Sequence, residues 1–421
     1  MFFTKKPVEK EKILLEWPPL LKKREIQDMV HGPISLFHPL DQVVDRREFQ
    51  RLRELKQQGV SYFVCSCSTH SRFVHSLGAY WLAYKFVESL KRDTSLNITS
   101  QDYLCVCLAA LCHDLGNGPF PHFDGAFRHA SGTATQSEFS DSDGNWLPRG
   151  RPVEKAFLYD IVSDGSGLID VDKFDYLVRD SFHAGIPIPF NKDSIERLIE
   201  NARVLPDPVL GFPRIYYAKK VANILSSVGD SRQMMHNLVY QHRDVRAVEE
   251  LMAQTMNLAD KYIKYMGDDG KEYSLSKVTQ NLEAYLKTTD AVLTEIANSS
   301  NAEISKARKI LEDIARRNIP VMIAEVECGP SCAELGVRVI KRELVGKTHL
   351  MTRVLLHDNK VNDKIAQTVS DEWLRLKAPQ EAAVWSICLY VSRSMNNEER
   401  SKVVDAFDAA ITRFGLRCER F

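Results

Sequence analysis

An apolar stretch that ends in a histidine and an aspartate is the feature of this sequence that most limits its fold. Residues 103–112 are almost entirely apolar, and His113 and Asp114 follow them directly. The run is shorter than the about 20 residues of a membrane helix and is typical of a helix buried in a core. Burying a carboxylate is costly unless it has a partner, and a divalent metal ion is one such partner. The pair therefore indicates either a capped helix end or part of a metal site.

Helical periodicity dominates the first three quarters of the chain. Helices are expected over residues 41–56, 73–91 and 103–115, and with breaks from residue 153 to about residue 315. Thr99 and Asp102 predict a capping box at the start of the third helix. Gly116 is expected at its C-terminal end, where glycine is favoured.

The last hundred residues are different in character. Segments rich in Val, Leu and Thr predict strands over residues 336–345, 350–357 and 382–392, followed by an amphipathic helix over 398–414. Residues 129–152 are rich in Ser, Gly, Asp and Pro, which is typical of a long polar loop. The predicted fold is mainly α, with a tail over 1–20, a helical domain over 21–325 and a small α+β lobe over 326–421.

The composition excludes several classes of protein. The 421 residues include 56 Lys plus Arg and 56 Asp plus Glu, so no general electrostatic attraction to nucleic acid is expected. The nine cysteines do not form the paired clusters of a zinc site, which favours reduced thiols in an intracellular protein. No signal peptide or membrane helix is expected, which favours a nuclear or cytoplasmic protein that is not secreted.

Two sets of polar residues repeat every four positions and so share one face of a helix each. The first set is Asp172, Tyr176 and Asp180, and the second is Arg232, His236 and Tyr240. Arginine can bind phosphate oxygens in a fork, and aromatic rings can stack on a base or a sugar. The same pattern is also typical of two ordinary amphipathic helices whose polar faces point to solvent.

Seven short stretches resemble, in order, the HD-domain phosphohydrolases, and among them the deoxynucleoside triphosphate (dNTP) triphosphohydrolases that carry a sterile alpha motif before the HD domain. These stretches are residues 28–32 (DMVHG), 49–53 (FQRLR), 70–78 (HSRFVHSLG), 111–120 (LCHDLGNGPF), 157–162 (FLYDIV), 169–176 (IDVDKFDY) and 240–242 (YQH). The resemblance extends over residues 21–421, without the sterile alpha motif and part of the HD-domain insertion. It implies four ligands for a divalent Fe, Zn, Mn or Mg ion: His75, His113, Asp114 and Asp172.

The resemblance also implies a reaction, in which a dNTP is hydrolysed at its α-phosphate to a deoxynucleoside and tripolyphosphate, with Mg²⁺ accompanying the nucleotide. His122 would protonate the leaving 5′-oxygen and Asp124 would orient that histidine. The implied substrate-binding residues are Gln57, Arg72, Asn117, Lys173, Tyr176, Asp180, Arg232, His236, Tyr240 and Gln241. Of these, Arg72, Lys173 and Arg232 would contact the triphosphate. Gln57 and Asp180 would bind the 3′-hydroxyl, and Tyr176 and Tyr240 would pack on the sugar.

Regulation is implied in the same way. GTP and a dNTP would bind as activators at subunit contacts, drive assembly of a homotetramer and so control dNTP pools. The matching positions are Arg24, Gln27, Asp45, Gln50, Arg53, Lys220 and Arg317, whereas Val321 stands where the family has a lysine. From spacing alone, Asp45, Gln50 and Arg53 would form a solvated helix face.

Two departures from the family pattern leave alternative functions open. Asn117 stands where the family has a histidine, and an amide cannot transfer a proton. Residues 129–152 replace several helices, and His129 lacks the context of the family's active-site histidine there. The alternatives are another HD phosphohydrolase (a nucleotidase or cyclic-nucleotide phosphodiesterase), or a nucleotide sensor or weak single-stranded nucleic-acid binder without turnover.

Overall fold

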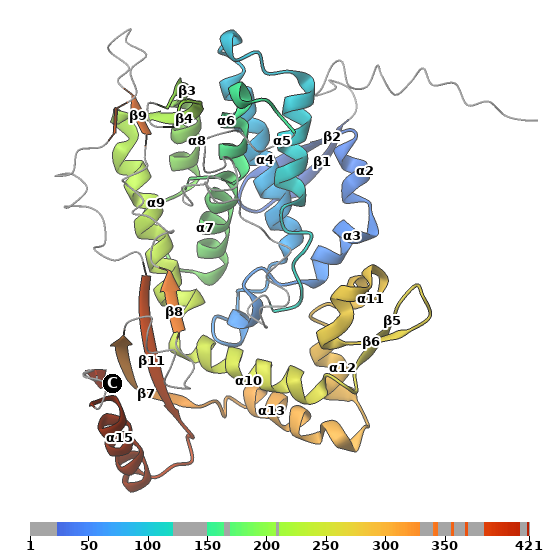
Figure 1. The fold of residues 1–421 in the computed structure, drawn as a ribbon, viewed down its shortest axis with the longest axis vertical. Helices are drawn as coiled ribbons and strands as arrows, with labels where there is room; N and C mark the ends of the chain where they lie inside the picture. The colour runs from blue at the N-terminus through green and yellow to red at the C-terminus, as the bar shows by residue number, and fades with distance from the viewer. Residues whose placement is uncertain are drawn as a thin grey trace, which may run out of the picture.

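The computed structural model describes residues 23–120, 150–163, 169–207, 210–328, 340–343, 355–357, 367–368, 383–412 and 419–420 (Figure 1). Its helices are α2 (Leu40–Val44), α3 (Arg47–Gln50), α4 (Arg72–Leu90), α5 (Ser100–Cys112), α6 (Phe157–Val162), α7 (Val171–Ala184), α8 (Lys192–Glu200), α9 (Ala222–Met235), α10 (Arg243–Ala259), α11 (Leu282–Lys287), α12 (Val292–Asn298), α13 (Ser305–Ala315) and α15 (Asn397–Thr412). Short 3-10 turns are η2 (Arg51–Glu54), η3 (Gly59–Phe63), η4 (Thr94–Leu96), η6 (Val153–Lys155), η7 (Lys219–Val221), η9 (Leu275–Gln280) and η10 (Ala302–Ile304), and η8 (His236–Tyr240) is a π-helical turn.

The described strands form small sheets. They are β1 (Lys23–Asp28), β2 (Gly32–Phe37), β3 (Ala202–Pro206), β4 (Pro213–Ala218), β5 (Lys264–Met266), β6 (Glu272–Ser274), β7 (Val321–Cys328), β8 (Ile340–Glu343), β9 (Leu355–His357), β10 (Gln367–Thr368), β11 (Ala383–Val391) and β12 (Glu419–Arg420). β1–β2 and β5–β6 are antiparallel hairpins, and the two larger sheets have the orders β10-β9-β4-β3 and β12-β7-β11-β8. The prediction of a mainly helical fold with a small α+β part is confirmed.

Two apolar cores organise the helices. The first core joins the β1–β2 hairpin to α4, α5, α6, α7, α8 and α9, and the second joins α10 to α13. Figure 1 shows the first group in the upper part of the molecule and the second at lower right. Val60 in η3 and Phe120 after α5 come from the part of the chain that builds the first core, yet they pack in the second core. The two cores therefore adjoin at these residues.

Helix α4 is buried along most of its length because α5, α7 and α8 all pack against it. The start of α5 has the predicted capping box: Thr99 Oγ1 accepts a hydrogen bond from the backbone N–H of Asp102 at 3.2 Å. The carboxylate of Asp102 accepts one from the N–H of Thr99 at 2.9 Å. The helix ends at Cys112, before the predicted end, so His113 is its C-cap and Gly116 lies beyond it in a turn. The expectation that Gly116 caps α5 was wrong.

The predicted helices over residues 73–91 and 103–115 are present as α4 and α5, and the three predicted C-terminal strands contain β8, β9 and β11. The single helix expected over residues 41–56 was wrong. Arg46 is extended (ψ 146°) and separates α2 from α3, and η2 follows. The apolar spacing is nevertheless met, since Val44, Phe49 and Leu52 are all buried. Residues 1–20 and most of the polar segment 129–152 lie outside the described residues.

The predicted division into domains stays a prediction. Strand β7 runs through the expected boundary between residues 325 and 326. Strand β9, from the C-terminal lobe, pairs in parallel with β4 of the helical part, with Tyr217 opposite Leu356. No helix in the described ranges is long and apolar enough to cross a membrane.

Candidate metal centre and its polar surroundings

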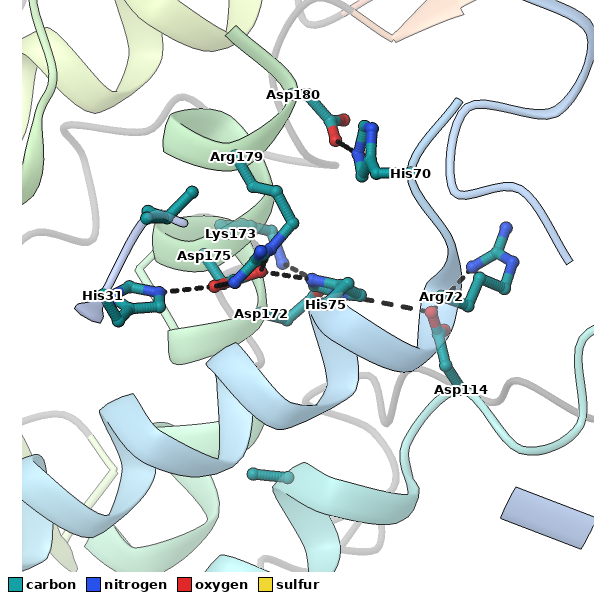
Figure 2. Close-up of polar contacts among 12 residues, drawn as sticks. His31, His70, Arg72, His75, Asp114, Asp172, Lys173, Asp175, Arg179 and Asp180 are labelled. Carbon is teal, nitrogen blue, oxygen red and sulfur yellow. Dashed lines mark hydrogen bonds and ion pairs between the residues drawn. The ribbon is translucent and has the colours of Figure 1, made fainter. Parts of the chain in front are cut away.

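Three helices bring the four predicted metal ligands together. His75 lies in the first turn of α4, His113 and Asp114 follow the end of α5, and Asp172 lies in the first turn of α7. Figure 2 shows the side chains of His75, Asp114 and Asp172 close to one another. His75 Nε2 lies 3.1 Å from His113 Nε2 and 3.0 Å from Asp172 Oδ1. Ligand atoms of His75, His113 and Asp114 all lie within 4.8 Å of one another. Bonds of about 2.1 Å to one metal ion would place neighbouring ligand atoms about 3.0–3.4 Å apart, close to these distances.

The outer partners of the two histidines fix their tautomers. His75 Nδ1 lies 2.7 Å from Asp175 Oδ2, and His113 Nδ1 lies 2.8 Å from the carbonyl oxygen of Ala110. A carboxylate and a carbonyl only accept, so both Nδ1 atoms carry a proton, and in the neutral rings both Nε2 atoms present a lone pair. Two such lone pairs and the Asp172 carboxylate would face one another, an arrangement that repels unless a proton or a metal ion lies between them.

The pKa shifts agree with a site that attracts positive charge. Burial lowers the pKa of His75, but hydrogen bonds to Asp172 and Asp175 outweigh it and raise that pKa to about 10. Burial raises the pKa of Asp172, but hydrogen bonds to His113 and His75 hold it well below its usual range. Nitrogen and oxygen donors of this kind suit a divalent transition metal or Mg²⁺. The residues therefore fit a divalent metal ion.

Asp114 is held by two donors beside the centre. Arg72 Nη1 donates to Asp114 Oδ2 at 2.7 Å, and Asn117 Nδ2 donates to Asp114 Oδ1 at 2.6 Å. Burial raises the pKa of Asp114, but Arg72 and His113 more than offset it and lower that pKa. The amide at position 117 thus orients a ligand of the candidate centre.

Basic side chains also lie close to the predicted metal ligands. Lys173 Nζ lies 2.7 Å from Asp170 Oδ2 and 4.0 Å from Asp172 Oδ2. Burial lowers the pKa of Lys173, but Asp170 and Asp172 raise it above its usual value. Burial raises the pKa of Tyr176, whereas the positive charges of Arg232 and Lys173 lower it in part. Of the residues predicted to bind the triphosphate, Arg72 contacts Asp114 and Lys173 lies near Asp172, so both lie beside the predicted metal ligands.

Asp180 is the centre of a second polar group on α7. Its Oδ1 lies 2.7 Å from His70 Nε2, and its Oδ2 accepts a hydrogen bond from the Tyr240 hydroxyl at 2.6 Å. The Tyr240 ring lies 6.4 Å from Tyr176 and 5.0 Å from His236, centroid to centroid. This face points inward, since Asp180 is only 2% exposed. The alternative of a polar face turned to solvent is therefore wrong for α7.

Two predicted substrate residues lie at the edge of this group. The backbone N–H of Gln57 donates to the carbonyl of His70 at 2.9 Å, and its buried Oε1 atom has no hydrogen-bond partner. The backbone N–H of Gln241 donates to His236 at 2.7 Å and closes the π-helical turn η8. The π turn interrupts the regular spacing from Arg232 to Tyr240, which the sequence pattern did not indicate.

The predicted activator residues fall into three places. The first group lies around β1, α2 and α3: Arg24 makes a bidentate ion pair with Asp45 at 2.7 Å, and Arg53 Nε donates to Gln50 Oε1 at 2.9 Å. Gln27 lies in the same strand as Arg24, β1. Lys220 is exposed in η7, directly before α9. Figure 1 shows α9 on the left of the molecule and α2 and α3 on the right. The third location is the end of α13, where Arg317 donates a hydrogen bond to the carbonyl oxygen of Phe63.

The predicted proton donor and its orienting residue, His122 and Asp124, lie outside the described residues, as does His129. Conversely, sequence analysis missed four buried polar residues that contact the site: His31, His70, Asp175 and Arg179. A signal was present in α7, because Asp172, Asp175 and Arg179 follow the three-to-four spacing of one helix face.

Helices that carry His75, His113-Asp114 and Asp172 around one point define an HD-domain protein with a candidate divalent-metal centre. The HD domain family model matches residues 72–141. The deoxynucleoside triphosphate triphosphohydrolase SAMHD1 of Gallus gallus is 36% identical over 349 residues, which cover 71% of this chain and 56% of that protein. The SAMHD1 of Homo sapiens is 34% identical over 349 residues (72% of this chain, 55% of that protein). The SAMHD1 homolog of Dictyostelium discoideum is 31% identical over 327 residues (72% and 60%).

The chain belongs to the HD-domain family, in the branch that includes these deoxynucleoside triphosphate triphosphohydrolases. It spans somewhat more than half the length of the curated relatives it matches.

Proposed function

We propose that this protein is a metal-dependent dNTP triphosphohydrolase that converts a dNTP and water into a deoxynucleoside and tripolyphosphate. One observation carries the proposal: the candidate metal cluster of His75, His113 and Asp114 lies beside the basic side chains of Arg72 and Lys173. A cation site next to several fixed positive charges suits a chain of phosphates. The names of the relatives, deoxynucleoside triphosphate triphosphohydrolases, support this choice of substrate.

The sugar would bind on the Asp180 side of the site. The Asp180 carboxylate already accepts from Tyr240, and its second oxygen pairs with His70, so it can accept a hydrogen bond from a 3′-hydroxyl with little rearrangement. The Tyr176 ring stands between His75 and Tyr240, with centroids 6.5 and 6.4 Å away. A ring in this place would pack on the sugar and crowd a 2′-hydroxyl, and so would favour deoxyribose over ribose.

In the reaction, a water oxygen bonds to the α-phosphorus while the bond from that phosphorus to the 5′-oxygen breaks. The 5′-oxygen leaves with a proton, for which His122, oriented by Asp124, is the proposed donor. A metal ion held by His75, His113, Asp114 and Asp172 would lower the pKa of water and neutralise charge on the phosphoryl oxygens. Arg72, Lys173 and Arg232 would hold the phosphates in line with the attack and stabilise the same charge.

Product analysis tests the proposal. The full chain is incubated with dATP, GTP and Mg²⁺ or Mn²⁺, and the products are separated by ion-exchange chromatography. We expect deoxyadenosine and tripolyphosphate, and their loss in His113→Ala. Release of phosphate or dAMP would favour another HD phosphohydrolase, such as a nucleotidase or phosphodiesterase. No turnover by protein shown to hold metal would contradict the enzymatic proposal.

Asn117 favours a second candidate, a nucleotide sensor without turnover. Its side-chain amide donates a hydrogen bond to Asp114 and cannot transfer a proton. The predicted metal ligands and basic residues could still bind a nucleotide. Equilibrium dialysis with dATP separates the two candidates. A sensor should bind dATP without converting it, whereas an enzyme should release products. The relatives' names give no support to single-stranded nucleic-acid binding, and we do not propose it.

Activation by GTP and a dNTP, with assembly of a homotetramer, is a further part of the proposal. Arg24, Lys220 and Arg317 lie in β1, in η7 and after α13, and in the proposed assembly copies of the chain would bring them together around the activators. Sedimentation velocity with and without GTP and dATP tests it. A monomer under both conditions would contradict nucleotide-driven assembly, as would a tetramer that forms equally well without nucleotide. The nuclear or cytoplasmic location stays a prediction.

A further inference from the structure

The imidazole of His75 lies between two carboxylates of the same helix. Asp172 Oδ1 lies 3.0 Å from Nε2, and Asp175 Oδ2 lies 2.7 Å from Nδ1. The two acids are three residues apart on α7, so they lie on one face of that helix and reach opposite edges of the ring. Asp172 is half-buried at the metal cluster, whereas Asp175 is 0% exposed behind it (Figure 2).

The Asp175 carboxylate is itself held in place from two further directions. Arg179 Nε donates to Oδ2 at 2.8 Å and Nη2 donates to Oδ1 at 3.0 Å. His31 Nε2, from the turn between β1 and β2, lies 2.6 Å from Oδ1. Arg179 is in turn paired with Asp28 at the end of β1, with Nη1 2.8 Å from Oδ2. The orientation of Asp175 is therefore set by α7 and the hairpin together.

Helix α4 makes room for this carboxylate at one position. Gly78 lies one turn after His75, and a Cβ atom there would come within 1.9 Å of Asp175 Oδ1 and 2.5 Å of Arg179 Nη2. A glycine inside a helix lowers helix stability, so its use here is informative. Only glycine lets α4 approach the Asp175–Arg179 pair closely enough for the bond to His75.

We propose that Asp175 is a positioning residue for the metal centre: held by Arg179 and His31, it fixes the His75 tautomer and aims Nε2 at the metal. Ligating histidines commonly donate their other ring N–H to such a carboxylate, which orients the ring and makes it a better ligand. The hairpin that supplies Asp28 and His31 is then part of the support of the metal centre. The inference rests on the proposed function only in taking the His75 cluster as a metal site.

Metal affinity tests the inference with a readout other than turnover. The full chain is stripped with a chelator and titrated with Co²⁺, whose visible spectrum reports ligand geometry and whose affinity is measured against a chromogenic chelator. We expect Asp175→Asn to bind Co²⁺ about 10–100-fold more weakly and to shift the Co²⁺ absorption bands. The matched control is Asp180→Asn, the same change at another buried α7 carboxylate that contacts a histidine. It should keep the affinity and spectrum of the unaltered chain.

Each result either supports or overturns the inference about Asp175. Unchanged Co²⁺ affinity and spectrum in Asp175→Asn would overturn the inference, and so would an equal loss in Asp180→Asn. If Asp175→Asn does not fold, Gly78→Ala replaces it, because it keeps every charge and displaces the paired side chains of Asp175 and Arg179. Unchanged Co²⁺ binding would then overturn the inference. A metal-loaded chain that hydrolyses no dNTP would remove the proposed function alone. An unaltered chain that binds no Co²⁺ would remove both.

Discussion

Replacing Arg179 with methionine is predicted to destabilise the protein strongly. Arg179 is 1% exposed and makes two bidentate ion pairs, with Asp28 and with Asp175, whose side chains are also buried. Methionine fills a similar volume but leaves both carboxylates without their main counter-charge. Removing one partner of a buried ion pair costs about 3–5 kcal/mol, because the remaining charge stays desolvated.

The surroundings place the expected loss near the lower end of that range. Asp28 keeps hydrogen bonds from the backbone N–H groups of Val30 and His31, at 2.9 and 2.8 Å, and Asp175 keeps its two histidines. We therefore expect Arg179→Met to lower the free energy of unfolding by about 3 kcal/mol. Adding Asp28→Asn removes one of the carboxylate charges that Arg179→Met leaves unpaired by arginine. The double variant should therefore lose less unfolding free energy than the sum of the losses in the two single variants.

Urea denaturation of the metal-free chain, followed by near-ultraviolet circular dichroism, measures these differences. Arg197→Met is the matched control, since Arg197 is exposed on α8 and such changes usually fall within about 0.5 kcal/mol. A loss below about 1 kcal/mol for Arg179→Met would refute the reasoning, since that is the size expected of an exposed ion pair. Additive losses in the double variant would equally refute the claim that Arg179 and Asp28 are coupled.

Three further outcomes are expected. Thr99→Ala removes the α5 capping box and should cost about 1 kcal/mol by urea denaturation, whereas Thr99→Ser should cost little. Burial and nearby His70 lower the pKa of His183 to about 4 in the folded chain, against about 6.5 in the unfolded chain. Neutral His183 therefore contributes folding stability that is fully present above pH 6.5 and is lost as the pH falls toward 4. His183→Gln should therefore flatten the fall in stability between pH 7 and pH 5 by up to about 1 kcal/mol, after allowance for partial exposure; an unchanged fall would contradict this. Chelation of divalent ions should lower the thermal midpoint of the unaltered chain but not of His113→Ala; equal shifts would argue against a metal at this cluster.

Apolar periodicity predicted the long helices well, because each buries a continuous face. α4 and α5 begin within one to three residues of their expected starts, and the capping box fixes the start of α5. The same pattern failed over residues 41–56, where the buried residues are spaced as in a helix but the chain is extended at Arg46. The β1–β2 hairpin was also missed, since its strands carry little of the alternation that marks a half-buried strand.

The candidate site shows a different limit. Adjacent ligands such as His113 and Asp114 are visible in a sequence, but the partners of their outer atoms depend on packing between distant elements. His31 reaches Asp175 across 144 positions, and His70 reaches Asp180 across 110. Neither pair has a local signal, so only the three-dimensional arrangement brings them together.

The polar pattern of α7 is also that of an ordinary amphipathic helix on the protein surface. An amphipathic helix usually turns its charged face to solvent, and spacing alone cannot tell an inward face from an outward one. Here Asp175 and Arg179 are buried, whereas Phe182 near the end of the helix is 55% exposed. Burying charges in this way is costly unless each is paired, and every one of these charges has a partner. A helix that turns its charged face inward and keeps those charges paired is better explained by support of the proposed metal site than by stability, because well-packed apolar residues would stabilise the same core at least as well.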